Sequence, residues 1–103
     1  MDEKFKKAGE LINSSDHLTV FTGAGISVES GIPPFRGEKG IWNKYDPGKF
    51  TIEYFRSNPK ESWELISEVF YDLYGRAKAN KAHTILAEWE EKNIVDAVIT
   101  QNI

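Results

Sequence analysis

The feature that most constrains the fold is an apolar run that ends in a Gly-x-Gly turn. Leu18–Phe21 is predicted to be a buried strand, and Gly23 and Gly25 follow it after one threonine. A strand that leads into Gly-x-Gly and then a helix start is how parallel α/β proteins hold a pyrophosphate. Neither glycine carries a Cβ, so the backbone can turn sharply and approach a ligand closely. The segment therefore predicts a phosphate-binding loop.

The match to the general dinucleotide fingerprint is incomplete. The third glycine of G-x-G-x-x-G is replaced by Val28, and the next glycine is Gly31. No Gly-Lys-Ser/Thr follows at the P-loop spacing, so a P-loop is excluded. Taken alone, the two glycines also fit a tight structural turn.

A second apolar strand is predicted near the end of the chain. Ile94–Thr100 is interrupted only by Asp96, and helical patterns separate it from the first strand. Strands joined in this way are expected to pair in parallel, so that Thr22-Gly23 and Gln101-Asn102 meet at the carboxyl edge where open α/β folds bind ligands. The fold class is α/β, a partial Rossmann-like unit of two parallel strands with a helical insertion at about residues 32–92.

Helix signals mark the insertion. In Asn58-Pro59-Lys60-Glu61, Asn58 suits the N-cap, Pro59 the first position and Glu61 the third, from which its carboxylate can reach back to the cap. Asn80 is expected to cap a further helix. Residues 32–50 have no regular period and are predicted to be a long functional loop.

Composition excludes several classes of site. The 103 residues carry a net charge of −3, no cysteine and two histidines, so we expect no nucleic-acid partner, no disulfide and no metal site. One domain with 40% hydrophobic content can build a core. No apolar run approaches the roughly 20 residues of a membrane-spanning helix. We expect a cytoplasmic protein without a membrane partner.

The longer string around the glycines is more specific. Residues 22–37 read TGAGISVESGIPPFRG, and residues 100–103 read TQNI. Both strings resemble the sirtuin family, the NAD-dependent protein deacylases, whose signature is close to GAGxSxxSGIPDFRG with TQNID downstream. Gly40-Ile41-Trp42 and Asn80–His83 also resemble archaeal and bacterial sirtuins, so the resemblance extends over essentially all of residues 1–103. Pro34 departs from it, standing where many members have Asp.

The resemblance implies a sirtuin-type fold that binds NAD and acts on acyl-lysine in proteins or peptides. The chain ends one residue before the Asp of TQNID. The resemblance places the remaining strands, the catalytic His and the four zinc-binding Cys after that point. We therefore interpret residues 1–103 as the amino-terminal part of a sirtuin NAD-binding domain, truncated, with no catalytic residue in this chain and inactive alone as a deacetylase.

Four candidate cofactor residues lie in and beside the Gly-x-Gly turn. Gly23, Ala24 and Gly25 are predicted to wrap the pyrophosphate. Ser27 is suited to a hydrogen bond with phosphate, and a helix N-cap accounts for it almost equally well.

Five further candidates follow along the chain. The resemblance places Ile32, Phe35 and Asn102 around the nicotinamide, and a core anchor is the alternative for Phe35. Arg36 offers a bidentate fork to a phosphate or carboxylate, or forms a structural salt bridge. Gln101 and Asn102 carry amides suited to ribose hydroxyls and the nicotinamide amide, or are simple turn formers.

The two histidines are not predicted to be catalytic. His17 precedes the first strand, at the edge opposite the ligand site, and His83 lies at a helix start, where a structural histidine is the favoured interpretation. Two other functions stay open: a module that binds NAD or ADP-ribose without chemistry, and a structural fragment that self-associates. Self-association is expected because a two-stranded parallel sheet leaves open apolar edges.

Overall fold

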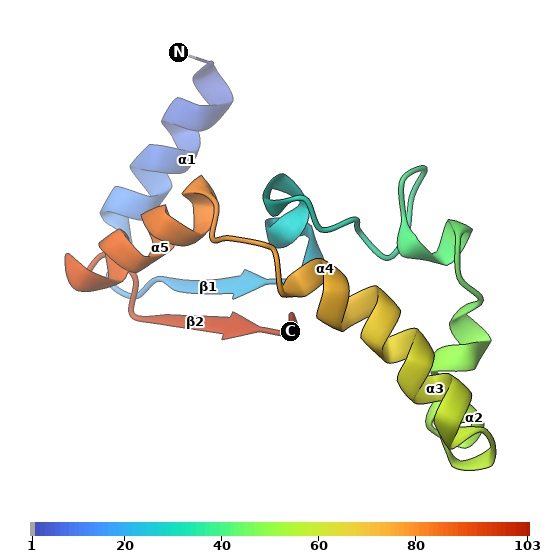
Figure 1. Cartoon of the computed structure of the whole chain (residues 1–103). Coiled ribbons are helices and arrows are strands. Elements are labelled where there is room, and N and C mark those ends of the chain that lie inside the picture. Colours follow the sequence, from blue (N-terminus) through green and yellow to red (C-terminus); the bar gives the residue numbers. More distant parts are fainter. Residues whose placement is uncertain (1) are drawn as a thin grey trace. The chain divides into compact units, whose positions relative to one another are not determined.

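The computed structural model describes residues 2–103, with the side chain of Leu73 excepted, and divides the chain into two compact units. The first unit contains the residues up to Ile26 together with Lys81–Ile103, and the second is Ser27–Asn80. The predicted insertion covers about residues 32–92, whereas the helix of residues 81–91 belongs to the first unit. The elements are, in chain order (Figure 1), α1 Glu3–Ser14, β1 Thr19–Thr22, η1 Ala24–Ser30, η2 Ile41–Asn43, η3 Pro47–Phe50, α2 Ile52–Ser57, α3 Pro59–Ile66, η4 Ser67–Tyr71, α4 Asp72–Tyr74, α5 Lys81–Glu91 and β2 Ala97–Thr100.

The two described strands pair in parallel, which confirms the predicted α/β class. Thr19 pairs with Ala97 and Thr22 with Thr100, so the strands end at the same level (Figure 1). β1 begins one residue later than predicted and β2 begins three residues later. The parallel register brings the two strand ends, 78 residues apart in sequence, to one edge of the sheet.

The late start of β2 has a local cause at the end of α5. Asn93 has a φ of 60°, the left-handed conformation that commonly ends helices. The N–H groups of Ile94 and Val95 then donate to the Trp89 carbonyl, at 2.8 and 3.1 Å. These two apolar residues therefore close the helix, and Val95 is buried there.

Asp96, the charged residue in the predicted strand, joins the beginnings of the two strands. Its backbone N–H donates to the Leu18 carbonyl at 2.9 Å, and its Oδ2 accepts the Leu18 N–H at 3.2 Å. His17 Nδ1 lies 3.3 Å from the same Oδ2. These contacts hold the end of the sheet opposite the carboxyl edge.

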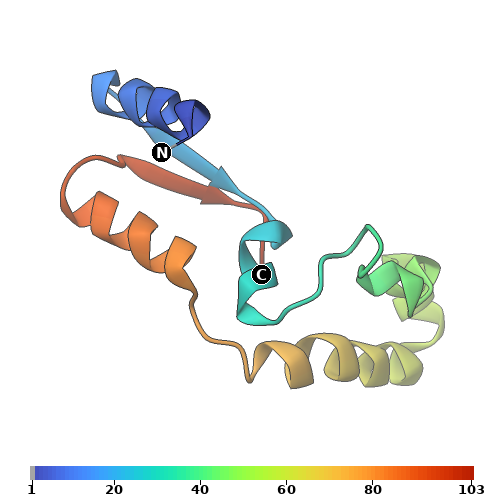
Figure 2. The ribbon, with the colours of Figure 1, turned by 90° about the horizontal axis from the view of Figure 1, so that it is seen from above.

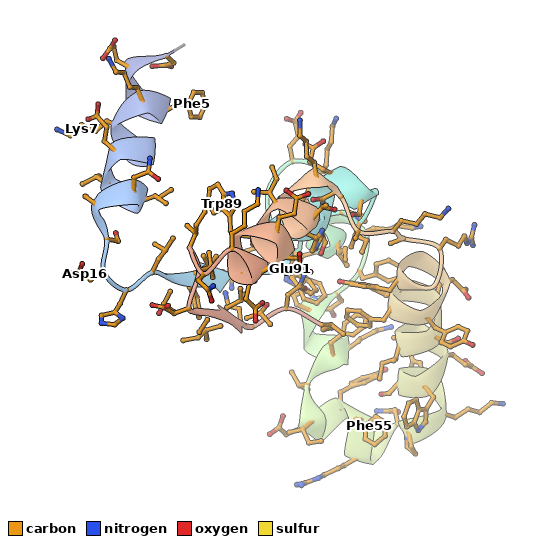
Figure 3. The ribbon with its side chains drawn as sticks, turned by 90° about the vertical axis from the view of Figure 1, so that its left-hand side faces the viewer. Phe5, Lys7, Asp16, Phe55, Trp89 and Glu91 are labelled. Atoms are coloured by element: carbon orange, nitrogen blue, oxygen red, sulfur yellow. The ribbon has the colours of Figure 1, made fainter. Side chains whose placement is uncertain are left out.

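One face of the sheet is partly covered and the other is open. Figure 2 shows β1 and β2 between α1 and α5. Val20, with Ile85 and Trp89 of α5, lines a cavity on one face. On the other face Phe21 is 67% and Ile99 54% exposed. Phe5 projects from α1 and is also exposed (Figure 3).

The second unit is organised by aromatic side chains and a few buried aliphatic ones. Ile32, Ile41 and Val69 are buried. The aromatic cluster, as we call these contacting rings, has centroid separations of 5.4 to 6.3 Å and comprises Phe35, Trp42, Tyr45, Phe50, Phe70 and Tyr74. A separate pair, Phe55 and Trp63, joins α2 to α3 with ring centroids 5.5 Å apart (Figure 3).

The start of α3 follows the predicted boundary but not the predicted cap. Pro59 is the first residue of α3, whereas the Asn58 side chain makes no capping hydrogen bond. Glu61 does not reach back to the cap: its Oε1 binds Lys49 Nζ at 3.0 Å and its Oε2 accepts the Tyr54 hydroxyl. A tertiary contact with η3 and α2 has replaced the local one.

The same contacts shift the pKa of each partner. The hydrogen bonds from Tyr54 and then Lys49 hold the pKa of Glu61 below its ordinary value. The hydrogen bond to Glu61 raises the pKa of Lys49 and of Tyr54. A carboxylate with a lowered pKa stabilises the fold above its unfolded pKa, and that stabilisation is lost as pH falls through the folded pKa.

We predict that Glu61→Gln lowers the urea midpoint of unfolding near pH 7, because Lys49 and Tyr54 lose their charged acceptor. The difference from the parent chain should shrink as the pH falls through the lowered pKa of Glu61 in the folded state, where the carboxylate takes up a proton. Urea unfolding at several pH values measures this. Glu64→Gln, on the exposed side of α3, is the matched control, and a Glu61→Gln effect that stays constant from neutral to acid pH would contradict the assignment.

Candidate cofactor site

The carboxyl edge of the sheet brings together the candidates of the first unit. β1 ends at Thr22 and leads into Gly23, while β2 ends at Thr100 and leads into Gln101. The Gln101 N–H donates to the Thr22 carbonyl at 3.2 Å, which extends the ladder by one bond. Gly23 and Gln101 therefore lie side by side, as the strand pattern predicted.

Gly23 is in close contact with the Gln101 amide. A Cβ added at Gly23 would lie 3.1 Å from Gln101 Nε2, tighter than ordinary van der Waals contact, whereas one added at Gly25 would meet nothing within 4 Å. The first glycine therefore permits the strand ends to approach, and the second leaves open space beside the backbone. Ala24 lies between them as the first residue of η1.

The helix that follows Gly23 is a 3₁₀ helix of seven residues, and Gly25 is its second residue. The Ile26 N–H donates to the Gly23 carbonyl at 3.2 Å, so the turn forms immediately after β1. Ser27 is buried inside this helix, which begins at Ala24. The N-cap alternative for Ser27 is therefore wrong, because the cap position lies earlier in the chain.

Two threonine hydroxyls meet at the strand ends. Thr22 Oγ1 donates to Thr100 Oγ1 at 2.8 Å, and the Asn102 N–H donates to the same Thr100 oxygen at 3.0 Å. The Asn102 side-chain Oδ1 in turn accepts the Ile103 N–H at 2.9 Å. Thr22 and Thr100 were not among the predicted site residues, because their pairing depends on the strand register, which neither segment shows by itself.

A cavity of about 320 Å³ lies between the sheet and α5 in the first unit. Its polar lining comes from Thr22, Thr100, Asn102 and His83. Its apolar lining comes from Ile26, Leu86, Val98 and Ile103. His83, interpreted from the sequence as structural, thus contributes to the same cavity wall as Asn102. Its sequence position near the start of α5 did not predict a place in the cavity wall.

The loop of the second unit that carries Phe35 and Arg36 is held by its own backbone. The Ile41 N–H donates to the Pro34 carbonyl at 2.7 Å and the Trp42 N–H to the Phe35 carbonyl at 3.0 Å. A Cβ added at Gly40 would lie 2.6 Å from the Arg36 carbonyl carbon, so only glycine fits this turn.

The loop side chains differ in their surroundings. Ile32 is buried, and its N–H donates to the Ser27 carbonyl at 3.3 Å. Phe35 stacks on Trp42, with ring centroids 5.4 Å apart, in the aromatic cluster, as its core-anchor alternative requires. Arg36 is exposed and forms no ion pair with any residue in the described range, so the structural salt bridge is not formed there.

The nine candidates therefore divide between the two units. Five of them come together at the carboxyl edge of the first unit: Gly23, Ala24, Gly25, Gln101 and Asn102. The other four belong to the second unit: Ser27, Ile32, Phe35 and Arg36.

The described residues contain no group of three or more His, Cys, Asp or Glu side chains placed to hold a metal ion. None of the described helices is both long enough and apolar enough to cross a membrane.

Comparison with protein families identifies the chain's relatives. The Sir2 family model matches residues 23–103. An NAD-dependent protein deacylase 2 of Archaeoglobus fulgidus is 51% identical over 104 residues, covering 100% of this chain and 40% of the relative. An NAD-dependent protein deacetylase of Thermotoga maritima is 46% identical over 100 residues, covering 97% of this chain and 40% of the relative. The chain thus spans about two fifths of the length of these curated relatives.

Solved structures agree with the sequence relatives. A Sir2 enzyme structure concerned with mechanism and regulation superimposes with a TM-score of 0.88 at 50% identity, covering 100% of this chain and 40% of that one. A Sir2 complex with a p53 peptide and NAD+ gives a TM-score of 0.81 at 43% identity, covering 100% of this chain and 39% of that one. The fold, the motif-bearing residues and the relatives converge: this chain belongs to the Sir2 family, the sirtuins.

Proposed function

We propose that this chain is the NAD-binding segment of an NAD-dependent protein-lysine deacylase. The observation that carries the proposal is the contact of Gly23 with Gln101 at the carboxyl edge of a parallel strand pair. Ligands of open α/β sheets bind at this edge. The relatives from Archaeoglobus fulgidus and Thermotoga maritima are an NAD-dependent protein deacylase and an NAD-dependent protein deacetylase, and we take the proposed reaction class from them.

The residues at this edge fit a dinucleotide. Gly25 leaves open space beside its backbone, so a pyrophosphate can approach the chain there without meeting a side chain. The Gln101 amide is exposed beside Gly23 and offers a donor and an acceptor to ribose hydroxyls. The half-buried amide of Asn102 lines the cavity of the first unit and is suited to the nicotinamide amide.

The candidate residues of the second unit have side chains of the types that suit NAD binding. The guanidinium of Arg36 is exposed, so its fork of donors is accessible to a phosphate or carboxylate. Ile32 and Phe35 are apolar and suited to excluding water from the reacting bond. The Ser27 hydroxyl remains our candidate for a hydrogen bond to phosphate. When bound, NAD supplies an ADP-ribosyl group and a nicotinamide leaving group, and acyl-lysine is the acceptor in the whole protein.

The first prediction of this proposal concerns binding. The chain should bind ADP-ribose weakly, and Gly23→Val should reduce the affinity by about tenfold or more, because the β-branched side chain displaces the Gln101 amide and blocks the backbone N–H groups. Isothermal titration measures both. Gly9→Val is the control, since an added Cβ at Gly9 in α1 meets nothing within 4 Å. Equal affinities of Gly23→Val and the parent would refute the phosphate-loop assignment.

The second prediction concerns turnover. The sirtuin resemblance places the general base and the zinc-binding cysteines outside residues 1–103, and a general acid–base group typically contributes about 10²–10⁴-fold to the rate. The chain alone should therefore release no nicotinamide from NAD and an acetyl-lysine peptide. Chromatographic detection of nicotinamide is the measurement. Release that scales with the concentration of this chain, and disappears in Gly23→Val, would overturn the prediction and favour a complete catalytic site. A chain that binds without turnover also fits the simple NAD-binding module.

A second candidate function, self-association, has a specific observation in its favour. Phe21 and Ile99 expose an apolar face on the sheet, and open sheet edges recruit other chains. We predict that this chain self-associates at micromolar concentration, with a mass above the 11.7 kDa of one chain. Light scattering coupled to size exclusion measures the mass. A single monomeric peak, unchanged in a Phe21→Ser, Ile99→Ser double variant, would rule out association through this face.

A further inference from the structure

The hydroxyls of Thr22 and Thr100 form a hydrogen-bonded pair at the ends of the two strands. The two residues face each other in the parallel register and are the last residues of their strands. Two positions earlier on the same face the pair is Val20 and Val98. The side chains thus change from two isopropyl groups to two hydroxyl-bearing groups of similar shape, at the level where the proposed ligand edge begins.

We propose that Thr22 and Thr100 are positioning residues whose hydroxyl pair fixes the backbone of Asn102 for ligand binding. The proposal rests on the proposed NAD-binding function for its consequence, and on the strand register and the hydrogen bonds for its geometry. Neither threonine needs to touch the ligand. Their role is to hold the turn after β2, which carries the two amides.

The number of hydrogen bonds that the Thr100 hydroxyl accepts supports this role. A hydroxyl oxygen has two acceptor sites, and Thr100 Oγ1 uses both: one takes the Thr22 hydroxyl at 2.8 Å and the other takes the Asn102 N–H at 3.0 Å. The oxygen thereby links the end of β1 to the backbone two residues beyond the end of β2. Valine at either position would keep the shape and break the link.

The neighbouring hydrogen bonds show which backbone N–H groups depend on the hydroxyl pair. Gln101 N–H is held by the Thr22 carbonyl at 3.2 Å, a backbone bond that does not involve the hydroxyls. The Asn102 N–H, in contrast, is held by the Thr100 hydroxyl. Loss of that hydroxyl should therefore release Asn102 and leave the Gln101 bond in place. This difference separates a positioning role from a general stabilisation of the sheet, which would affect both amides.

Four substitutions separate the contributions. Thr100→Val removes both links, Thr22→Val removes one, and Thr100→Ser keeps a hydroxyl at the same place. Thr19→Val is the matched control, because Thr19 lies at the other end of β1, opposite Ala97. If the pair acts as one unit, the Thr22→Val, Thr100→Val double variant should behave like Thr100→Val alone.

The test measures two properties of the 103-residue chain: the exchange of individual backbone amides with water, by NMR, and the affinity for ADP-ribose. In Thr100→Val the Asn102 amide should exchange about three- to tenfold faster and the affinity should fall by a similar factor, as expected for one lost hydrogen bond. The Gln101 amide should be unchanged. Thr100→Ser and Thr19→Val should resemble the parent in both measurements.

Three other outcomes would each contradict one step of the proposal. Unchanged Asn102 exchange in Thr100→Val would show that the hydroxyl does not hold this backbone. Faster exchange with unchanged affinity would show that the turn is held but is not positioned for the ligand. If the parent itself fails to bind ADP-ribose, the proposed function fails and the ligand consequence with it. The Asn102 exchange in that case still decides whether the hydroxyl pair fixes the turn.

Discussion

The parallel pairing of β1 with β2 is the constraint on which the candidate site depends. Residues 78 positions apart become neighbours only because the two strands end at the same level, with Thr22 opposite Thr100. Asp96 secures the opposite end of the pair through both hydrogen bonds with Leu18. The glycine turn and the Gln101 amide then meet without any further element. Without this register, Gly23 would be an ordinary turn glycine, and the amides after β2 would have no phosphate loop beside them.

The parts of this arrangement that the sequence predicted are those set by local pattern and chain direction. An apolar run before Gly23 and another before Gln101 sufficed to predict two parallel strands and their shared edge. The start of β2 was predicted too early, because Ile94 and Val95 are as apolar as a strand but close α5 at the left-handed Asn93. Apolar character alone cannot distinguish a strand residue from the cap of a preceding helix.

Tertiary contacts explain the features that the local sequence pattern did not predict. Glu61 stands at the correct spacing for a capping box, but Lys49 and Tyr54 offer it a cation and a hydroxyl donor. The Thr22–Thr100 pair and the place of His83 in a cavity wall follow from strand register and helix packing, which no single segment encodes. The family resemblance was carried by contiguous motifs and needed none of these contacts.

We propose that ADP-ribose binds at the carboxyl edge of the strand pair, and amide chemical-shift mapping can locate the bound ligand residue by residue. Titrating the isotope-labelled chain with ADP-ribose should move the backbone amides of Gly23, Ala24, Gly25, Gln101 and Asn102 together, with a single dissociation constant. The amides at the opposite end of the sheet, Leu18 and Asp96, should stay in place. Shifts at Leu18 and Asp96 with none at Gly23–Gly25, or no shifts at millimolar ligand, would contradict the account.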